Sequence, residues 1–321
     1  GFINPKFFVN EYGKVLRKLI LENYSILQIV NMGQCNIFNK ASTYPSINIF
    51  SKHSDENNLI KYFGNKQIKI SEKIVVEKPR YYKQTNFYNN ANYEYVFNGS
   101  EYDEKILKKI ENKSQKIKTI YHYQRGLPND KIIFTKRGQF FGIKSYHTKR
   151  YYIEKENEKI NFKNEIIEEK YSRIFAEELI LLPRTVLKLT ASLKNDNRII
   201  LDRIYFLKKK TERFDNKFIL GLLNSTLINF WFEIHYNSTK VRGNYFDLRG
   251  TQIENIPVKI ASKPHQKPFI KLVDKILKQK EKDPESDTSK IEKQIDNEVY
   301  KLYGLSEEEI KVVENEATET V

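Results

Sequence analysis

The cationic residues of this 321-residue chain are the first to suggest a chemistry, because they are strongly clustered. Between Lys105 and Lys159, fifteen Lys or Arg residues stand against five Asp or Glu, so this segment carries ten of the fifteen net positive charges. Tyr and Phe alternate with the basic residues there. Clustered cations attract polyanions, and aromatic rings between them can pack on sugars or bases. We therefore expect a nucleic acid as the partner.

Four residues of this segment are candidates for contacts with a nucleic-acid backbone. Gly126 and Gly142 permit turns that present backbone N–H groups. Three cations and one tyrosine follow them: Lys144, Tyr146, Lys149 and Arg150. The cations suit phosphates and the tyrosine ring suits a sugar. Such contacts position a protein on a duplex without reading its sequence.

A second basic group lies in a polar loop further along the chain. The loop opens with Asn237–Thr239, Lys240 and Arg242 supply positive charge, and Gly243 and Gly250 allow sharp turns. These cations are further candidates for contacts with DNA.

A strongly apolar helix pair is expected to support this loop. Asp215 and Ser225 are suited to cap two successive helices, because their side-chain oxygens can accept backbone N–H bonds. The apolar residues that follow the two caps are Phe218, Ile219, Leu222 and Leu223, and then Leu227, Ile228, Phe230, Trp231, Phe232 and Ile234. So much apolar surface around short helices predicts burial on most sides.

Composition excludes several other classes of function. One cysteine, Cys35, cannot form an internal disulfide framework, and five scattered histidines lack metal-site spacing. No apolar run reaches membrane-spanning length, and Gly1–Phe2 begins no signal peptide. Glu-x-Lys triplets of the kind found in nucleases occur only on Lys-rich stretches, where chance matches are common. We expect a cytoplasmic fragment with no metal and no membrane partner.

The first residues read as the closing part of an α/β sheet. We expect a strand end at 1–3, a helix over 5–23, and strands over 25–32 and 44–52 with a loop at 35–42 between them. The helix is expected to bury Phe8, Val15, Leu16, Leu19 and Ile20. A polar linker is expected over 53–65.

The middle of the chain alternates strands and helices. A half-buried strand is expected over 67–77, and an amphipathic helix with a Lys-rich outer face over 103–117. The Tyr/Asn-rich stretch 81–97 reads as a surface loop, with stacking on single-stranded bases as the alternative. After a helix over 162–178 and a strand broken at Pro183, we expect a hairpin turning at 195–197. Its first strand is expected to place Leu187, Leu189, Ala191 and Leu193 on one face.

The last part is expected to be helical. One helix spans 267–282 and ends at Asp283–Pro284, and a second runs to Gly304, a typical C-cap. Ser306 and Glu309 have the spacing of a capping box for a final short helix. We expect a C-terminal helical hairpin.

The stretch LGLLNSTLINFWF, the basic glycine loop and the closure IENIPV together resemble the C-terminal specificity domain of TaqI-like adenine DNA methyltransferases. This domain also occurs in type IIG restriction–modification enzymes. The Arg184–Thr185 step resembles a strand end that precedes this helix pair in the family. Gly126 and Gly142–Tyr146 match family elements loosely, and QIDNEVYKLYGLSEEE resembles the tail of type IIG enzymes.

The resemblance extends to the end of the family's catalytic domain. Phe38 occupies the position of a loop aromatic that stacks on the adenine swung out of the duplex, with Lys40 just after it. A core Phe closing a loop is the alternative for Phe38. The family's glycine-rich cofactor turn and its Asn-Pro-Pro-aromatic motif are both absent, since Asn4–Pro5 is followed by Lys6. The resemblance thus implies S-adenosylmethionine for the parent enzyme and no cofactor or catalytic residue in this chain.

These expectations combine into one hypothesis. The chain is a mixed α/β protein: a remnant of a Rossmann-like methyltransferase sheet over 1–55, a target-recognition domain over 66–260 and a helical segment over 263–316. It binds double-stranded DNA beside an upstream methyltransferase domain of the same parent, with the presence of a nuclease left open. Arg184, Lys188 and Arg242 read base edges. The alternative is a specificity or assembly module of a multi-subunit restriction system, which would contain two similar halves.

Overall fold

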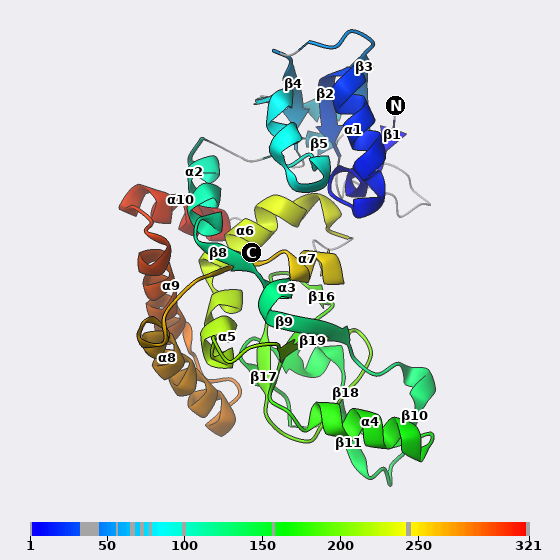
Figure 1. Cartoon of the computed structure of the whole chain (residues 1–321), viewed down its shortest axis with the longest axis vertical. Helices are drawn as coiled ribbons and strands as arrows, with labels where there is room; N and C mark the ends of the chain where they lie inside the picture. Colours follow the sequence, from blue (N-terminus) through cyan, green and yellow to red (C-terminus); the bar gives the residue numbers. More distant parts are fainter. Residues whose placement is uncertain are drawn as a thin grey trace. The chain divides into compact units, whose positions relative to one another are not determined.

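The computed structural model describes residues 2–32, 45–55, 57–64, 68–70, 74–76, 79–97, 101–155, 158–241 and 245–318 (Figure 1). The chain forms two compact units. The first comprises Gly1–Glu101 with Glu233–Phe246, and the second comprises Tyr102–Phe232 with Asp247–Val321. The assignment of the three predicted segments to functional domains stays a prediction.

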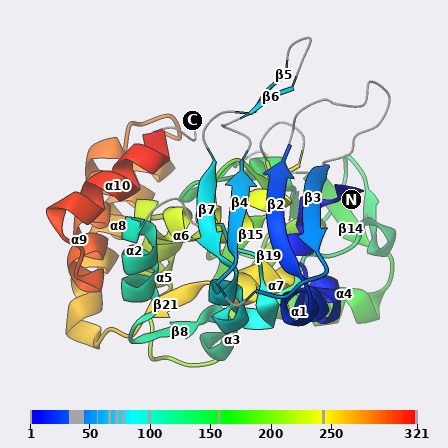
Figure 2. The same cartoon turned by 90° about the horizontal axis from the view of Figure 1, so that it is seen from above.

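The first unit is built on a five-stranded sheet with the strand order β1-β3-β2-β4-β7 (Figure 2). Its strands are β1 (Phe2–Ile3), β2 (Ser25–Asn31), β3 (Ser46–Ser51), β4 (Leu59–Phe63) and β7 (Arg80–Lys83). β2 and β4 are parallel, whereas the other neighbours are antiparallel. The predicted strands at 25–32 and 44–52 are confirmed. The predicted linker over 53–65 is wrong, because β4 extends the same sheet.

The first helix differs from its prediction in both its start and its buried face. α1 spans Lys14–Asn23 and follows two 3-10 turns, η1 (Pro5–Phe8) and η2 (Glu11–Gly13). Val15, Leu16 and Leu19 are exposed, and Arg17 is buried in their place. The guanidinium of Arg17 donates to the backbone carbonyls of Phe7, Asn10, Asn92 and Tyr93. A buried cation with its donors satisfied by carbonyls thus overrides the apolar pattern.

The Tyr/Asn-rich stretch is packed rather than a surface loop. It continues from β7 into η4 (Gln84–Asn89) and η5 (Ala91–Tyr93). Phe87 and Tyr95 are buried, with their rings stacked and their centroids 5.2 Å apart. Gln84 is buried as well and donates to the carbonyls of Leu21 and Tyr24. Neither predicted alternative anticipated this core, because its partners come from the first thirty residues.

The single strand expected over 67–77 is two short strands. β5 (Ile68–Ile70) pairs antiparallel with β6 (Ile74–Val76). Pairing satisfies backbone groups that one isolated strand would leave without partners.

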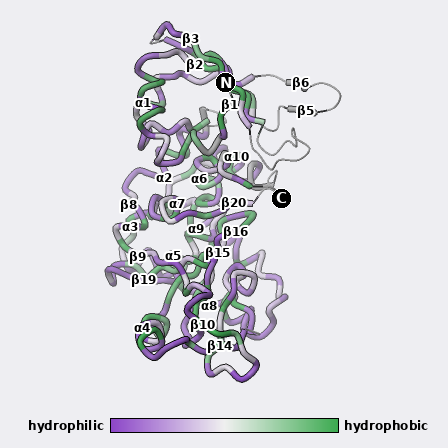
Figure 3. The backbone as a smooth tube through the Cα atoms, turned by 90° about the vertical axis from the view of Figure 1, so that its right-hand side faces the viewer, coloured by the Kyte–Doolittle hydropathy of each residue, from purple (hydrophilic) through white to green (hydrophobic). Residues whose placement is uncertain are grey.

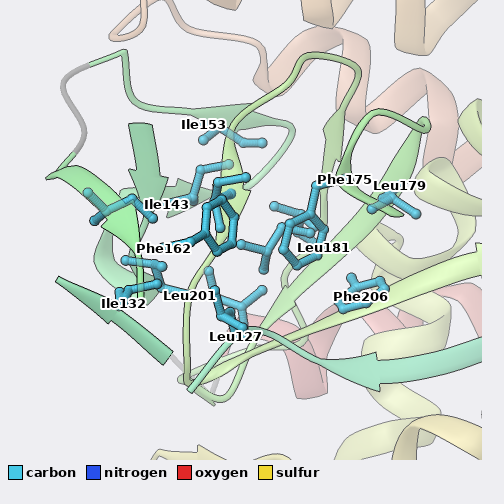
Figure 4. Packing of buried hydrophobic residues seen from close by; sticks show 14 residues of the cluster. Leu127, Ile132, Ile143, Ile153, Phe162, Phe175, Leu179, Leu181, Leu201 and Phe206 are labelled. Atoms are coloured by element: carbon cyan, nitrogen blue, oxygen red, sulfur yellow. The ribbon is translucent and has the colours of Figure 1, made fainter. Parts of the chain in front are cut away.

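The second unit contains two four-stranded sheets. One has the order β17-β15-β19-β9 and the other the order β10-β14-β11-β18. The strands of the first are β9 (Tyr121–Arg125), β15 (Leu179–Pro183), β17 (Ser192–Lys194) and β19 (Ile204–Lys209), and those of the second are β10 (Ile132–Phe134), β11 (Phe140–Ile143), β14 (Glu158–Phe162) and β18 (Ile199–Ile200). A shared core that includes Leu127, Ile143, Phe175, Leu181 and Phe206 joins them (Figure 4).

The predicted hairpin over 187–207 is wrong. β17 pairs with β15, and β18 pairs in parallel with β11, so the two sides of the 195–197 turn enter different sheets. Leu187 is exposed, whereas Ser192 and Lys194 are fully buried. The Lys194 ammonium donates to the carbonyls of Phe175 and Asp196. The bond to Phe175 lies outside the local pattern from which the buried face was predicted.

The helix pair of the central stretch is confirmed. α5 spans Asn216–Asn224, and Asp215 caps it by accepting the Lys217 N–H at 2.8 Å. α6 spans Thr226–Tyr236, and the Ser225 hydroxyl accepts the Ile228 N–H at 3.3 Å. The predicted apolar residues up to Phe232 are buried. α7 (Gly250–Glu254) and β21 (Pro257–Lys259) follow, and β21 pairs with β8 (Ser114–Lys116).

The remaining helices are α2 (Glu101–Glu111), α3 (Ile117–Ile120), α4 (Glu165–Phe175), α8 (Lys263–Lys282), α9 (Ser289–Tyr303) and α10 (Glu307–Thr318). The last four agree with their sequence signals. The helix predicted over 103–117 ends at Glu111, and β8 and α3 replace its last part. Gly304 ends α9 with φ 69°, and the Ser306–Glu309 capping box is formed, with both bonds present. In Figure 3 hydrophobic residues are interspersed with hydrophilic ones along the tube, and none of the described helices is long and apolar enough to cross a membrane.

Candidate nucleic-acid interface

Arg184 is held in a fixed pose by Asp247. It lies between β15 and β16 (Thr185–Val186), where Pro183 ends the first strand. Its Nε donates to Asp247 Oδ1 at 2.7 Å and its Nη2 to Oδ2 at 3.2 Å. The Arg184 carbonyl accepts the Leu248 N–H at 2.7 Å, which fixes the approach of the segment bearing Asp247. The hydrogen bond to Asp247 raises the pKa of Arg184 above its ordinary value. This bidentate geometry orients the guanidinium plane.

The sequence interpretation did not select three arginines near Arg184. Arg203 accepts the Arg184 N–H through its carbonyl at 2.8 Å, and Arg125 forms an ion pair with Asp202 at 2.8 Å. Arg249 follows Leu248 and is exposed. The sequence offers only the adjacent Asp202–Arg203 and the nearby Asp247 and Arg249 as a signal, and the proximity of these residues depends on strand pairing that no local pattern shows.

The structure brings Lys144 and Tyr146 together. Lys144 follows β11, and its ammonium donates to Glu158 at 3.0 Å, as does the Tyr146 hydroxyl. The Lys144 ammonium also lies 4.8 Å from the ring centroid of Phe134. Partial burial lowers the pKa of Lys144, but the hydrogen bond and charge of Glu158 outweigh that effect and raise it. Tyr146 is 58% exposed. The pair presents a cation and an aromatic ring to solvent, with Glu158 neutralising part of the charge.

His147 shapes the turn that holds this pair. Its Nδ1 accepts the Lys144 backbone N–H at 3.0 Å, and its side chain is buried. Burial lowers the pKa of His147, so the ring remains a neutral acceptor at neutral pH.

Lys149 and Arg150 diverge in their surroundings. Lys149 is about half exposed and pairs with Glu154 at 3.1 Å. Arg150 pairs with Glu292 of α9 and lies against the ring of Tyr151. Tyr151 adopts φ 64° at this turn. The two neighbours therefore do not form one cationic surface.

The remaining predicted contacts are placed as follows. Lys188 is half-buried and has interactions with its surroundings. Lys240 is buried, and its ammonium donates to Glu233 at 2.6 Å and lies 4.7 Å from the ring centroid of Phe246. Phe38, Lys40 and Arg242 lie outside the described residues. The roles assigned to all of these residues stay predictions.

A turn in the second unit exposes two further cations. Lys136 and Arg137 stand in the turn between β10 and β11, and both are exposed. Phe134 and Phe141 on the adjoining strands are 42% and 48% exposed, and the Lys159 ammonium lies 5.7 Å from the ring centroid of Phe141. Cations and rings thus alternate on this surface, as the composition of the segment predicted.

Residues 142–258 match the family of TaqI-like C-terminal specificity domains. The resemblance carried by the central helix pair and its glycine loop is confirmed over this range. A comparison with curated proteins gave no match.

Several solved structures are similar to this chain. The type IIL restriction–modification enzyme MmeI, in complex with DNA, aligns with a TM-score of 0.58 and 13% identity over 97% of this chain and 47% of MmeI. The type IIG restriction endonuclease BpuSI aligns with a TM-score of 0.42 and 11% identity over 94% of this chain and 47% of BpuSI. The S subunit of a type I restriction–modification system from M. genitalium gives a TM-score of 0.34 and 14% identity over 52% of this chain and 40% of that subunit. The chain spans about half the length of the two enzymes, and its fold is mixed α/β as predicted.

Proposed function

We propose that this chain is the sequence-specific DNA-recognition part of an adenine-specific DNA methyltransferase in a restriction–modification system. The match of residues 142–258 to a specificity-domain family carries this proposal. The concentration of net positive charge between Lys105 and Lys159 supports it, because phosphates dominate the affinity of proteins for DNA. The chain contributes binding, and the methyl-transfer chemistry belongs to an upstream domain of the same parent that uses S-adenosylmethionine.

The candidate residues divide into three roles. Arg184, Lys188 and Arg242 read base edges, since planar or extended donors near a rigid helix pair can be aimed. The residues that hold phosphates and sugars are Lys40, Lys144, Tyr146, Lys149 and Arg150. Lys240 is not among them, because its ammonium is buried and paired with Glu233. Phe38 stacks on the extruded adenine of the parent's reaction.

Binding to duplex DNA is the direct test. We expect the wild-type chain to bind a duplex of random sequence with an affinity that falls steeply as salt rises, because each neutralised phosphate releases counterions. Fluorescence anisotropy over a series of salt concentrations measures the slope. The double variant Lys136→Glu/Arg137→Glu should bind more weakly, with the slope of log K against log salt reduced by about two.

A matched variant separates local contacts from net charge. Lys267→Glu/Lys271→Glu changes the net charge equally on exposed positions of α8. This variant should lower the affinity for DNA less than Lys136→Glu/Arg137→Glu does, and it should keep most of the slope of log K against log salt. Absence of duplex binding by the wild type at low ionic strength would refute the proposed function.

A further inference from the structure

Two arginine–aspartate pairs adjoin each other in the second unit. One is Arg184 with Asp247, and the other is Arg125 at the end of β9 with Asp202. The 2.8 Å bond from the Arg184 N–H to the Arg203 carbonyl ties the first pair to the residue after Asp202. β9 pairs with β19, and α7 packs against β9 (Figure 1). We call the side chains of Arg125, Asp202, Arg184 and Asp247 the arginine patch.

In the part of the chain that the structure describes, the guanidinium N–H groups of Arg125 and Arg184 are not all hydrogen-bonded, whereas Arg198 uses all three of its guanidinium nitrogens. Arg198 pairs with Asp196 through Nε and Nη2 at 2.7 Å, and its Nη1 donates to the Glu154 carbonyl at 2.8 Å. Within the described residues Arg184 Nη1 has no such bond, and the contact of Arg125 with Asp202 at 2.8 Å is made through Nε. The patch therefore retains N–H groups for a ligand.

Stability alone does not account for these pairs. The side chains of Arg184 and Asp247 are 31% and 22% exposed, and those of Arg125 and Asp202 are 49% and 28% exposed. Ion pairs with this access to water contribute a net of about 0–1 kcal/mol once the loss of side-chain entropy is included. What the aspartates supply is a fixed orientation of each guanidinium plane.

The surroundings of the patch are rigid. Tyr123 and Tyr205 pack edge to face with centroids 6.1 Å apart, and Tyr205 is the register partner of Arg125. A Cβ at Gly250 would lie 2.3 Å from the Tyr123 ring, so α7 approaches this ring as closely as only glycine allows. Arg203 adopts φ 67°, a left-handed conformation that non-glycine residues rarely take. Backbone strain and tight packing of this kind are typical of sites that must be held in place.

The chemistry of the patch favours a base edge over a phosphate. The carboxylates of Asp202 and Asp247 repel a phosphate, whereas an uncharged base edge meets no such repulsion. Guanine presents two acceptors, N7 and O6, on one edge, and a fixed guanidinium matches them with two parallel N–H donors. A carboxylate oxygen beside it can accept from the amino group of the paired cytosine. All four side chains thus have a use at G·C pairs.

We propose that Arg125 and Arg184 each select a guanine in the recognised DNA, with Asp202 and Asp247 as the positioning residues that aim them. This inference rests on the proposed function of sequence-specific DNA recognition. It adds the base identity, Arg125 as a further reading arginine, and both aspartates.

The test uses the whole chain and a pool of duplexes with a randomised central stretch. The bound fraction is sequenced for the wild type, Arg125→Lys, Arg184→Lys and Asp247→Asn. The wild type should enrich a motif with fixed guanines. Each lysine variant should lose the preference at one guanine by roughly 5- to 150-fold while keeping its affinity for random duplex, because the charge remains and the fork is lost. Asp247→Asn should weaken the preference at the Arg184 guanine alone.

Arg198→Lys is the matched control, because it alters an arginine–aspartate pair whose donors are already used. Its selected motif should equal that of the wild type. As a second readout, 7-deazaguanine replaces each selected guanine. The loss of N7 should weaken wild-type binding and should have little further effect on the lysine variant that reads the same position.

The outcomes separate the two proposals. If the wild type binds DNA and selects no motif, sequence-specific recognition fails and this inference fails with it. If the wild type selects a motif that contains no guanine, or one that the Arg125 and Arg184 variants leave unchanged, the inference alone is overturned.

Discussion

Two buried cations show most clearly where the fold of this protein departs from its local sequence pattern. Arg17 and Lys194 are both fully buried, and both donate to backbone carbonyls. Burial costs a charge its hydration, and carbonyl dipoles replace only part of it. For Lys194 the nearest carboxylate oxygen, Asp196 Oδ1, lies 3.8 Å away, and burial lowers the pKa of the ammonium to about 8.

This shift predicts that stability rises with pH through a defined window. The folded chain binds fewer protons at Lys194 than the unfolded chain between pH about 8 and the ordinary lysine pKa of 10.5. The free energy of unfolding should therefore increase as pH rises from about 8 toward 10.5. The full gain is on the order of 3 kcal/mol.

Urea denaturation at pH values across this window measures the effect, with Lys194→Met as the comparison. The variant has no ionisable group at position 194. The free energy of unfolding of the wild type should therefore increase relative to that of the variant as pH rises through this window. If the difference in free energy of unfolding stays constant across the window, folding does not lower the pKa of Lys194.

At the scale of elements, α9 is fastened to the central helix pair by a cap from a distant residue. Asp296 accepts the Thr226 N–H at 2.7 Å and the Thr226 hydroxyl at 2.6 Å, so a side chain of α9 caps the N-terminus of α6. A negative group at a helix N-terminus satisfies an otherwise unpaired donor and complements the helix dipole.

Removal of this cap should destabilise the second unit. Asp296→Ala should cost about 1–2 kcal/mol in the free energy of unfolding, because the Thr226 N–H loses its acceptor. Asp296→Asn should cost less, since its amide oxygen can still accept. Thermal or urea unfolding gives both values. On the same helix, Glu298→Ala removes only a surface pair with Lys301 and should cost no more than about 0.5 kcal/mol. Equal losses for Asp296→Ala and Glu298→Ala would contradict the capping role.

The elements also show which predictions the sequence could support. The Asp215 cap, the Gly304 stop and the Ser306–Glu309 box were predicted correctly, because each signal and its partner lie within a few residues. β17 pairs with β15 rather than with the strand after the turn, and Arg17 donates to carbonyls 75 and 76 residues away, so local alternation predicted the wrong strand pairing and the wrong helix face. The candidate site follows the same division. Arg184 was singled out from the Arg184–Thr185 pair in the sequence. Its partner Asp247 is distant in sequence, and only the fold brings the two together.

At the scale of the whole molecule, the sequence has features suited to binding DNA but not the motifs that bind a methyl donor in the family it resembles. The chain carries a formal charge of +15, and the glycine-rich cofactor turn and the Asn-Pro-Pro-aromatic motif do not occur in it. Binding of S-adenosylmethionine needs backbone N–H groups that a glycine-rich turn brings close to the ligand. Affinity for DNA requires only a cationic surface and aimed donors.

We therefore expect this chain to bind duplex DNA and to show no measurable affinity for S-adenosylmethionine. Isothermal titration calorimetry with the cofactor, alone and in the presence of a saturating duplex, measures this directly. The DNA titration of the same preparation is the control that the chain is folded and competent. Micromolar cofactor binding in either state would show that the described units contain a cofactor site of another design. DNA binding without cofactor binding would support the proposal that the chain serves recognition and that methyl transfer belongs to another domain.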